Sequence, residues 1–267
     1  MTIALGVLAS DGVVLAADTE YTWGYLKTSG EKIWTAEADG AMAVTGAGAS
    51  DYLEAISQQL LAAFAGSGRK VSVAGLERKF TRVLAAFHEK HVIPFSRFSQ
   101  DQIEFWLVIA LRRKGKSYLW ATGKNNLRAC SRYAAAGVGR EYVEALFVRA
   151  LGPRTGRLAG VDLAARLSAY AVFEAKRHVQ YCGKSTSLVV LRDERIEETS
   201  ASKIQLLDYH FNAYSDVQAL GLKYALGFPY KDGKAASDNL SNYFRGLRQD
   251  MLATETMDFS GRERSLE

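Results

Sequence analysis

The sequence predicts an α+β fold, a four-layer αββα sandwich in which two stacked antiparallel sheets carry helices on their outer faces. Three observations predict it: the chain opens with a β-hairpin, its strands come in blocks, and each block is followed by a pair of amphipathic helices. Of the 267 residues, 48% are hydrophobic and 24% charged, and only 3 are proline. Such a composition is typical of a soluble globular chain with one large core.

The first block of strands opens at the second residue. Residues 2–8 and 13–18 are rich in Val, Ile, Leu and Ala, and Ser10-Asp11-Gly12 forms a short turn between them. A further strand is expected at AMAVTG, residues 41–46. Most chains fray at their first residues, so a sheet that starts this early indicates that the N-terminus is held in place, and chemistry is one reason to hold it.

Paired helices and a second block of strands follow. Apolar residues at three- and four-residue spacing predict helices over residues 49–66, 73–92, 141–151 and 162–179. Aromatic and β-branched residues predict the second block and the closing strands, over residues 102–113, 116–123, 127–137, 185–192 and 195–201. This alternation is typical of two stacked sheets with helices outside.

One domain is expected over residues 1–205, because no internal repeat or low-complexity linker interrupts this region. Residues 206–267 form a C-terminal extension of different character. Its first part is apolar enough to pack and is expected to be partly helical, whereas its end, DFSGRERSLE, is polar and expected to be mobile. An interface or gating element and a stabilising appendage explain the extension equally well.

A net charge of +5 and a pI near 9.1 do not by themselves indicate a nucleic-acid partner. The densest basic run, residues 112–116, lies between two apolar runs, where a hairpin turn belongs. It lacks the pattern of a recognition helix or of interleaved aromatic residues. We interpret it as a solvated turn and expect no nucleic-acid binding.

The sequence also lacks the motifs of metal-binding, membrane-spanning and nucleotide-binding proteins. His88 and His91 lack a carboxylate-supported metal signature, and Cys130 and Cys182 offer neither a disulfide framework nor a zinc spacing, so we expect no metal and two reduced, at least partly buried thiols. Neither a membrane span nor a signal peptide is apparent, which predicts a cytoplasmic protein. GVG at residues 137–139 lacks the Lys and Ser or Thr of a phosphate-binding loop, so any ATP-dependent unfoldase would be a separate chain.

Several segments, in their order along the chain, resemble a proteasome β subunit or the related peptidase of the bacterial heat-shock protease, both N-terminal nucleophile hydrolases. The segments are TIALGV, DGVVLAAD, TWG, GEKIW, AMAVTGAGASDY and AAGVGREY. The resemblance covers about the first 200 residues, is densest in the first 52, and leaves the last 65 or so outside. It implies rings whose sites face an enclosed chamber, a peptide or unfolded protein as substrate, and no cofactor.

Carried over onto the matching positions, the resemblance assigns the nucleophile to Thr2, the conserved acid to Asp18, the catalytic lysine to Lys32 and the oxyanion-hole glycine to Gly46. Between the acid and the lysine the chain is two residues shorter than the usual pattern. The lysine assignment therefore depends on EKIW, and Lys27 is the competing candidate.

The resemblance also places a substrate site. It assigns substrate alignment to Thr22 and makes Tyr21, Val44 and Gly48 walls of the specificity pocket, with no opposing charge at its base except Glu20. An apolar pocket favours apolar residues before the cut. We predict cleavage after Leu, Tyr or Phe in preference to Asp or Glu.

Four positions depart from the family pattern. The supporting serine and the later Asp and Ser fall on Val138, Val179 and Cys182, and a usual basic position two residues after the acid is Glu20. These departures bear on the strength of proton handling, not on the identity of the nucleophile.

The chemistry of the residues agrees with this assignment. A threonine hydroxyl is a poor nucleophile alone, but removing Met1 from before Thr2 would create an α-amine with a pKa near 8 beside it, a base suited to cellular pH. Lys32 would stabilise charge at the nucleophile, Asp18 would hold the lysine, and the amide of Gly46, in a turn where a side chain would crowd the substrate, would donate to the oxyanion.

Three functions follow from these observations. The first is a threonine peptidase subunit in a ring, and the second a ring-forming but catalytically silent subunit, which Val138 and Val179 favour. The third is a stand-alone amidase that acts on a small molecule, because a fold does not fix a substrate. The helix at residues 49–66 is expected to carry more apolar surface than covering a sheet requires, which predicts self-association into closed rings and supports the first two.

Overall fold

The computed structural model of the chain describes residues 2–23, 25–96, 104–123, 126–151, 160–226 and 233–253. They fall into two compact units, Met1–Glu198 and Thr199–Glu267, which are described separately. The division lies ahead of residue 205, because helix α6 (Ala201–Ala225) belongs to the second unit. Met1 itself and the polar end, residues 258–267, lie outside the described residues.

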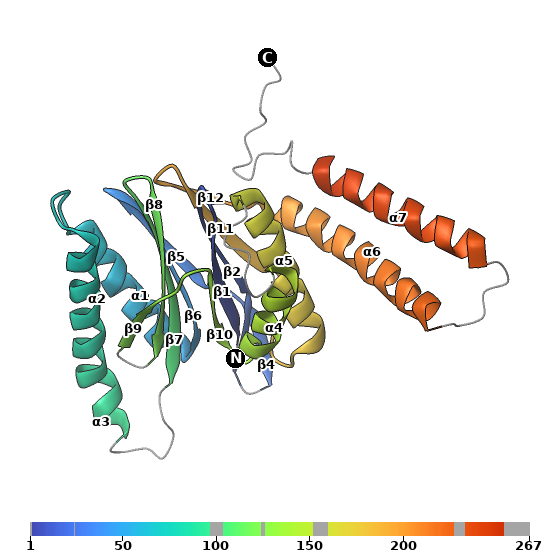
Figure 1. Cartoon of the computed structure of the whole chain (residues 1–267). Helices are drawn as coiled ribbons and strands as arrows, with labels where there is room; N and C mark the ends of the chain where they lie inside the picture. Colours follow the sequence, from blue (N-terminus) through green and yellow to red (C-terminus); the bar gives the residue numbers. More distant parts are fainter. Residues whose placement is uncertain are drawn as a thin grey trace. The chain divides into compact units, whose positions relative to one another are not determined.

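Two five-stranded antiparallel sheets form the centre of the first unit (Figure 1). The first sheet has the order β10-β1-β2-β11-β12, with β1 (Ile3–Leu8), β2 (Gly12–Asp18), β10 (Tyr133–Gly137), β11 (Thr186–Arg192) and β12 (Arg195–Glu198). The second sheet has the order β5-β6-β7-β8-β9, with β5 (Ile33–Ala38), β6 (Gly40–Gly48), β7 (Phe105–Arg113), β8 (Lys116–Gly123) and β9 (Asn126–Ala129). A separate two-stranded ribbon pairs β3 (Glu20–Trp23) with β4 (Leu26–Ser29).

Helices cover the outer face of each sheet, which confirms the predicted four-layer αββα arrangement (Figure 1). Helices α1 (Ser50–Ala65) and α2 (Val73–Phe87) pack on the second sheet, and α2 continues through a π-helical turn (His88–Val92) into the short α3 (Ile93–Ser96). Helices α4 (Arg140–Leu151) and α5 (Val161–His178) pack on the first sheet.

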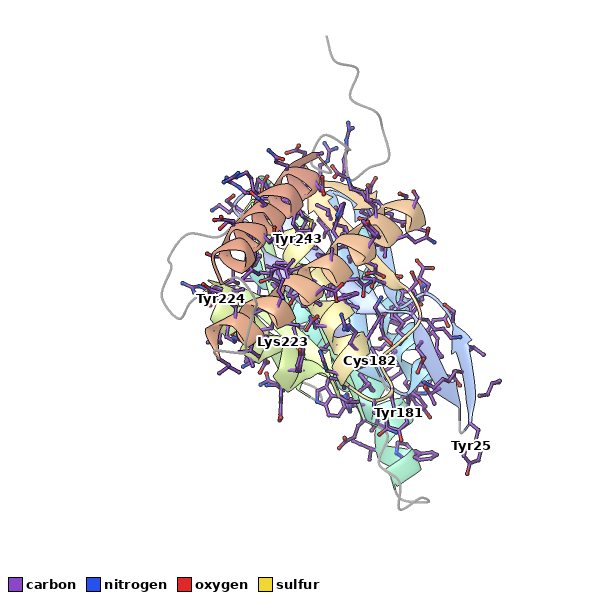
Figure 2. The ribbon with its side chains drawn as sticks, turned by 90° about the vertical axis from the view of Figure 1, so that its right-hand side faces the viewer. Tyr25, Tyr181, Cys182, Lys223, Tyr224 and Tyr243 are labelled. Carbon is purple, nitrogen blue, oxygen red and sulfur yellow. The ribbon has the colours of Figure 1, made fainter. Side chains whose placement is uncertain are left out.

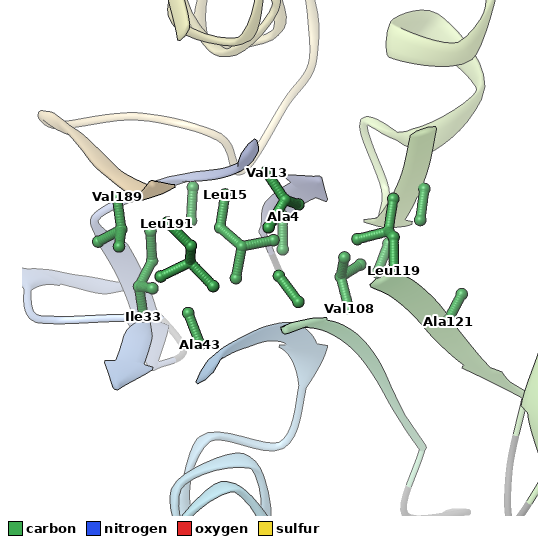
Figure 3. Close-up of a cluster of buried hydrophobic side chains, with 14 of the residues drawn as sticks. Ala4, Val13, Leu15, Ile33, Ala43, Val108, Leu119, Ala121, Val189 and Leu191 are labelled. Atoms are coloured by element: carbon green, nitrogen blue, oxygen red, sulfur yellow. The ribbon is translucent and has the colours of Figure 1, made fainter. Parts of the chain in front are cut away.

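The core between the two sheets is built from small and branched side chains of both (Figure 3). Strand β6 shows the alternation that separates this core from the one under the helices. Its odd-numbered residues Ala41 and Ala43 face the other sheet, whereas Met42 and Val44 face α1 and α2.

Helix α1 contradicts one expectation. Its large apolar residues are buried inside its own chain, namely Leu53, Ile56, Leu60, Leu61 and Phe64, and the exposed positions between them are polar or alanine. The surplus apolar surface expected from the sequence is absent from this helix, because both the second sheet and α2 take up its apolar face.

Residues 127–137, predicted as one strand, form two strands in different sheets. The chain bends at Ser131-Arg132, so β9 lies at the edge of the second sheet and β10 at the edge of the first. The opening hairpin agrees with its prediction, since β1 pairs antiparallel with β2.

The basic run at residues 112–116 is a hairpin turn, as predicted, but only part of it is solvated. Lys114 and Gly115 both have positive φ, at 51° and 70°, as a two-residue turn between twisted strands requires. Arg113 is only 3% exposed and pairs with Asp39 at 2.6 Å. That carboxylate and the carbonyl of Val71, 2.7 Å away, offset the burial of the guanidinium.

The second unit is a pair of helices, α6 and α7 (Gly233–Ala253), which contact each other. The hydroxyl of Ser200 caps α6 by accepting a hydrogen bond from the Lys203 amide. Among the described residues, no helix combines the length and the apolarity that crossing a membrane requires.

Candidate active site

Thr2 lies at the start of β1, between the two neighbouring strands β10 and β2 of the first sheet. It is 5% exposed. Its carbonyl packs so tightly against Gly137 that a Cβ there would lie 1.9 Å from the oxygen, and Gly137 has a φ of +96°. A glycine is therefore required at this position, for both the contact and the backbone conformation.

Lys32 precedes β5 and brings a buried cation to Thr2. It is 1% exposed, and its Nζ donates to Thr2 Oγ1, to Asp18 Oδ1 at 3.0 Å, and to the carbonyl of Glu20. Burial lowers the pKa of Lys32 below its usual value, while the carboxylate of Asp18 opposes that shift. The neutral amine is therefore more accessible than in an exposed lysine.

Lys27, the competing lysine, lies elsewhere. It is on β4 opposite Thr22, its side chain is 53% exposed, and it pairs with Glu20 at 2.9 Å. Of the two candidate lysines, the structure brings only Lys32 to Thr2.

Asp18 ends β2 and is fully buried. Its Oδ1 accepts from the Ile3 amide at 3.1 Å and from Lys32, and its Oδ2 accepts from the Gly183 amide at 3.1 Å. Two backbone donors from separate parts of the chain thus fix the carboxylate that holds the lysine. Gly183 was not predicted as a site residue, because a glycine after Cys182 gives no distinctive signal in the sequence.

Gly46 and Gly48 present their amides on the same edge of β6. Across the β6–β7 pairing, the Ala49 amide donates to the carbonyl of Glu104 at 3.3 Å. Since N–H groups alternate between the two edges of a strand, those of Gly46 and Gly48 point away from β7. On that edge the pairing with β5 ends at Thr45.

The reason for a glycine at position 46 differs from the one expected. Gly46 lies inside strand β6, not in a turn, and a Cβ there would lie 2.5 Å from the carbonyl of Trp106 and 2.8 Å from the Leu53 side chain. The crowding comes from the protein itself, not from the substrate. Gly48, rather than Gly46, lines the cavities next to Thr2.

The smaller of two cavities at Thr2 has a volume of about 310 Å³ and contains Tyr21, Thr22 and Gly48 among its lining residues. The Tyr21 hydroxyl donates to the carbonyl of Glu31 at 2.8 Å, and its ring centroid lies 4.9 Å from Lys32 Nζ. Burial raises the pKa of Tyr21 to about 12, so its phenol stays protonated at neutral pH.

Val44 is a correction to the predicted pocket. It is fully buried among the side chains that face α1 and α2 and lines neither cavity. The alternation along β6 turns its side chain into this core, a detail that the sequence match did not resolve.

The larger cavity, about 730 Å³, also contains Thr2, Gly48 and Ala49 in its lining. It extends between strands of the two sheets, past Ala121 of β8 and Ala136 of β10. Thr2 therefore lies where the two cavities meet.

Three of the four positions that depart from the family pattern carry no charged group, whereas the fourth is the carboxylate of Glu20. Val138 is 41% exposed and lines the larger cavity, Val179 follows the end of α5, and Cys182 lies in the segment between α5 and β11 (Figure 2). Burial, reinforced by Asp18, raises the pKa of Cys182 to about 12, so its thiol is protonated at neutral pH. Glu20 is buried, and its carboxylate accepts from the Thr22 hydroxyl at 3.4 Å.

No group of three or more potential metal-ligating side chains occurs among the described residues. Cys130 and Cys182 are both free, the first partly buried and the second buried.

No family model matches the chain. Among curated proteins, it is similar to proteasome subunit beta 1 of Thermococcus gammatolerans, with 30% identity over 201 residues, which are 74% of this chain and 92% of that protein.

Solved structures share the fold at lower identity. The helical assembly of the Anbu complex from Pseudomonas aeruginosa matches with a TM-score of 0.66 at 14% identity, over 87% of this chain and 99% of that chain. Anbu, an ancestral β-subunit, from Yersinia bercovieri matches with 0.65 at 13% identity, over 86% and 99%. A Gly-1 mutant of Anbu from Hyphomicrobium sp. strain MC1 matches with 0.65 at 17% identity, over 87% and 99%.

The structural likeness extends further along the chain than the expected family resemblance. A share of 87% of 267 residues is about 232 residues, more than the 198 residues of the first unit. The likeness therefore reaches into the second unit.

Proposed function

The chain belongs to the proteasome β-subunit family of N-terminal nucleophile hydrolases, and from this premise we propose that it is a threonine peptidase subunit. Thr2 becomes its nucleophile once Met1 is removed, and peptides or unfolded proteins are its substrates. We include in this proposal the cytoplasmic location expected from the sequence, and any ATP-dependent unfoldase that serves the subunit would be a separate chain.

The observation that carries the proposal is the contact of Lys32 Nζ with Thr2 Oγ1, in a site where Asp18 holds the lysine. A buried hydroxyl beside a buried amine of lowered pKa is arranged for proton transfer. Two amines can take the hydroxyl proton, the α-amine of Thr2 and the side chain of Lys32, and Lys32 is already in contact with the hydroxyl.

In the first half of the reaction, Thr2 Oγ1 forms a bond to the substrate carbonyl carbon as its proton passes to the amine. The carbonyl electrons move onto the oxygen, and the amides of Gly46 and Gly48 lie on the edge of β6 that can donate to it. When the tetrahedral centre collapses, the carbon–nitrogen bond breaks and the leaving amine takes up the proton. This leaves an ester on Thr2.

In the second half, water replaces the leaving amine. One water proton passes to the same amine base while the water oxygen attacks the ester carbon. The bond from that carbon to Thr2 Oγ1 then breaks, and the amine returns the proton to Oγ1. The enzyme is restored and the acyl product carries a new carboxylate.

We propose self-association into rings as the setting for this site. Family membership supports the proposal, and the Anbu complex from Pseudomonas aeruginosa, which shares the fold, is described as a helical assembly. The mass in solution tests it: sedimentation should give a multiple of 29.3 kDa at micromolar concentration. A single-chain mass would contradict assembly, and open helices in electron micrographs would contradict closure.

A silent subunit is the second candidate, and one specific observation favours it. Val138, Val179 and Cys182 occupy the positions at which the family places polar groups that support proton handling, and the Cys182 thiol is protonated at neutral pH. On this hypothesis Lys32 and Asp18 are a structural ion pair.

Reaction with a peptide epoxyketone separates the two candidates. The epoxyketone bonds to both the hydroxyl and the free α-amine of an N-terminal threonine, so a peptidase should carry the adduct on Thr2, located by peptide mass mapping. The Thr2→Ala variant should carry none. A wild-type chain that keeps Met1, or that stays unmodified despite a free Thr2, would favour the silent subunit.

A further inference from the structure

The two cavities share Thr2 but have different walls beyond it. Thr22 and the first residues of α1 line only the smaller cavity, whereas Thr2, Gly48 and Ala49 line both. An amide that is cleaved at Thr2 has its acyl part on one side of the attacked carbon and its leaving part on the other. With the acyl part aligned along Thr22, the leaving part enters the larger cavity.

The inner part of this cavity is apolar and lined by small side chains. Ala47, Leu107, Ala121 and Ala136 come from four strands of the two sheets. A volume of about 730 Å³ is within the range of small-molecule binding sites, roughly 300–1,000 Å³. An apolar side chain of the leaving part would fit there.

The same cavity has basic side chains in its lining. Arg128 of β9 and Arg140 at the start of α4 are exposed lining residues, and Glu104 is the acidic residue among the described part of the lining. Arg140 donates through its Nε to Glu144 at 2.9 Å, an ion pair within α4 that does not use its two terminal nitrogens. Glu144 offsets the charge of Arg140, and Arg128 and Arg140 together present two guanidinium groups to the cavity.

We propose that this cavity is a leaving-group subsite for an amino acid or short peptide that has an apolar side chain and a free α-carboxylate. The side chain occupies the alanine-lined interior and the carboxylate binds Arg128 and Arg140, since planar guanidinium groups are suited to carboxylates. The chain then cleaves peptides preferentially close to their C-termini. This inference rests on the proposed function, because it identifies the leaving part of that reaction.

Binding of a product tests the subsite without any turnover. Isothermal titration calorimetry should show that L-phenylalanine binds about tenfold more tightly than L-phenylalaninamide, because a charge-assisted hydrogen bond is lost with the carboxylate. The double variant Arg128→Gln/Arg140→Gln should abolish this preference. Arg195→Gln is the matched control, because Arg195 is an exposed arginine on β12 that does not line the cavity. Equal binding of the acid and the amide, or an unchanged preference in the double variant, would overturn the proposal.

Turnover of matched peptides, one with a free C-terminal carboxylate and one with a C-terminal amide, provides the second measurement. We expect kcat/KM to be about tenfold higher for the acid in the wild type, and this ratio to fall in the double variant. Cleavage of both peptides at equal rates would overturn the subsite but leave the peptidase standing. Carboxylate-dependent binding without cleavage of either peptide would support the subsite and contradict the peptidase.

Discussion

Two groups of residues around Thr2 differ sharply in chemistry. Lys32 and Asp18 form a buried, charged pair with five hydrogen bonds between them and their neighbours, to Thr2, to each other, to the Glu20 carbonyl and from two backbone amides. Val138, Val179 and Cys182 contribute two apolar side chains and a protonated thiol. The hydroxyl of Thr2 therefore accepts a hydrogen bond from a buried lysine, whereas the positions that would support its amine provide no charged group.

This difference indicates which of the two groups of residues handles the proton at Thr2. A buried cation that has lost its hydration persists only with close partners, so the chain retains a complete set for Lys32. The second group has no charge to satisfy and is filled by packing residues. We expect proton handling at Thr2 to depend more on Lys32 than the family pattern alone implies.

The largest expected effect is that of removing the nucleophile. Thr2→Ala should reduce peptide turnover by about 10⁴-fold or more, while Thr2→Ser keeps part of the activity because a hydroxyl remains. Turnover of a fluorogenic peptide, with thermal unfolding as the folding control, measures both. A bulky residue at position 2, which blocks Met1 removal, should silence the enzyme as fully. Full activity in Thr2→Ala would exclude the mechanism.

The next largest effect tests the charged group directly. Lys32→Arg should reduce kcat by about 100- to 1,000-fold despite keeping the charge, because a planar guanidinium does not fit between Thr2 and Asp18 and does not release its proton. Lys27→Arg is the matched control, since that side chain is largely exposed, and it should stay within about twofold of wild type. Equal losses in both variants would show that the distinction between the two lysines is wrong.

The pH dependence sharpens the same comparison. Burial lowers the pKa of Lys32, so the rate should rise with pH as its amine loses a proton. Asp18 raises the pKa of Lys32, so Asp18→Asn should move this rise to lower pH. At pH values between the lowered pKa of Lys32 in the folded chain and its ordinary pKa in the unfolded chain, Lys32 binds a proton only in the unfolded chain. The free energy of unfolding therefore also rises with pH through that range. Profiles of kcat/KM and of melting temperature against pH measure the two effects, and an unmoved rate profile in Asp18→Asn would contradict the role of Lys32.

The smallest effect comes from restoring polarity to the second group. Val138→Ser combined with Cys182→Ser should raise kcat about two- to tenfold, the worth of one or two added hydrogen bonds near the amine. Val148→Ser, at a comparably exposed valine on α4, is the control for a surface change of the same kind. A rate that stays at the wild-type value would show that these positions do not limit proton handling.

The sequence by itself determined the layered fold, and its family resemblance proposed Asp18 and one of two lysines as the charged group. Periodicity predicts the helices and most strands, because burial on one face imposes a pattern on neighbouring residues. The opening hairpin follows from an apolar run on each side of Ser10-Asp11-Gly12 and agrees with the pairing of β1 and β2. The separation of residues 127–137 into β9 and β10 was missed, since both halves have strand composition.

Only the tertiary structure decided which residues of a given type reach the site and which are buried or paired elsewhere. Lys27 and Lys32 were competing candidates in the sequence, yet Lys27 lies on β4 and is largely exposed, whereas Lys32 immediately precedes β5 and contacts Thr2. Val44 points into the helix-covered core and Arg113 finds Asp39, because side-chain direction and long-range partners are set by sheet register. The meeting of two cavities at Thr2 depends on strands from both sheets. These strands are far apart in the sequence, so no local sequence pattern predicts that they lie side by side.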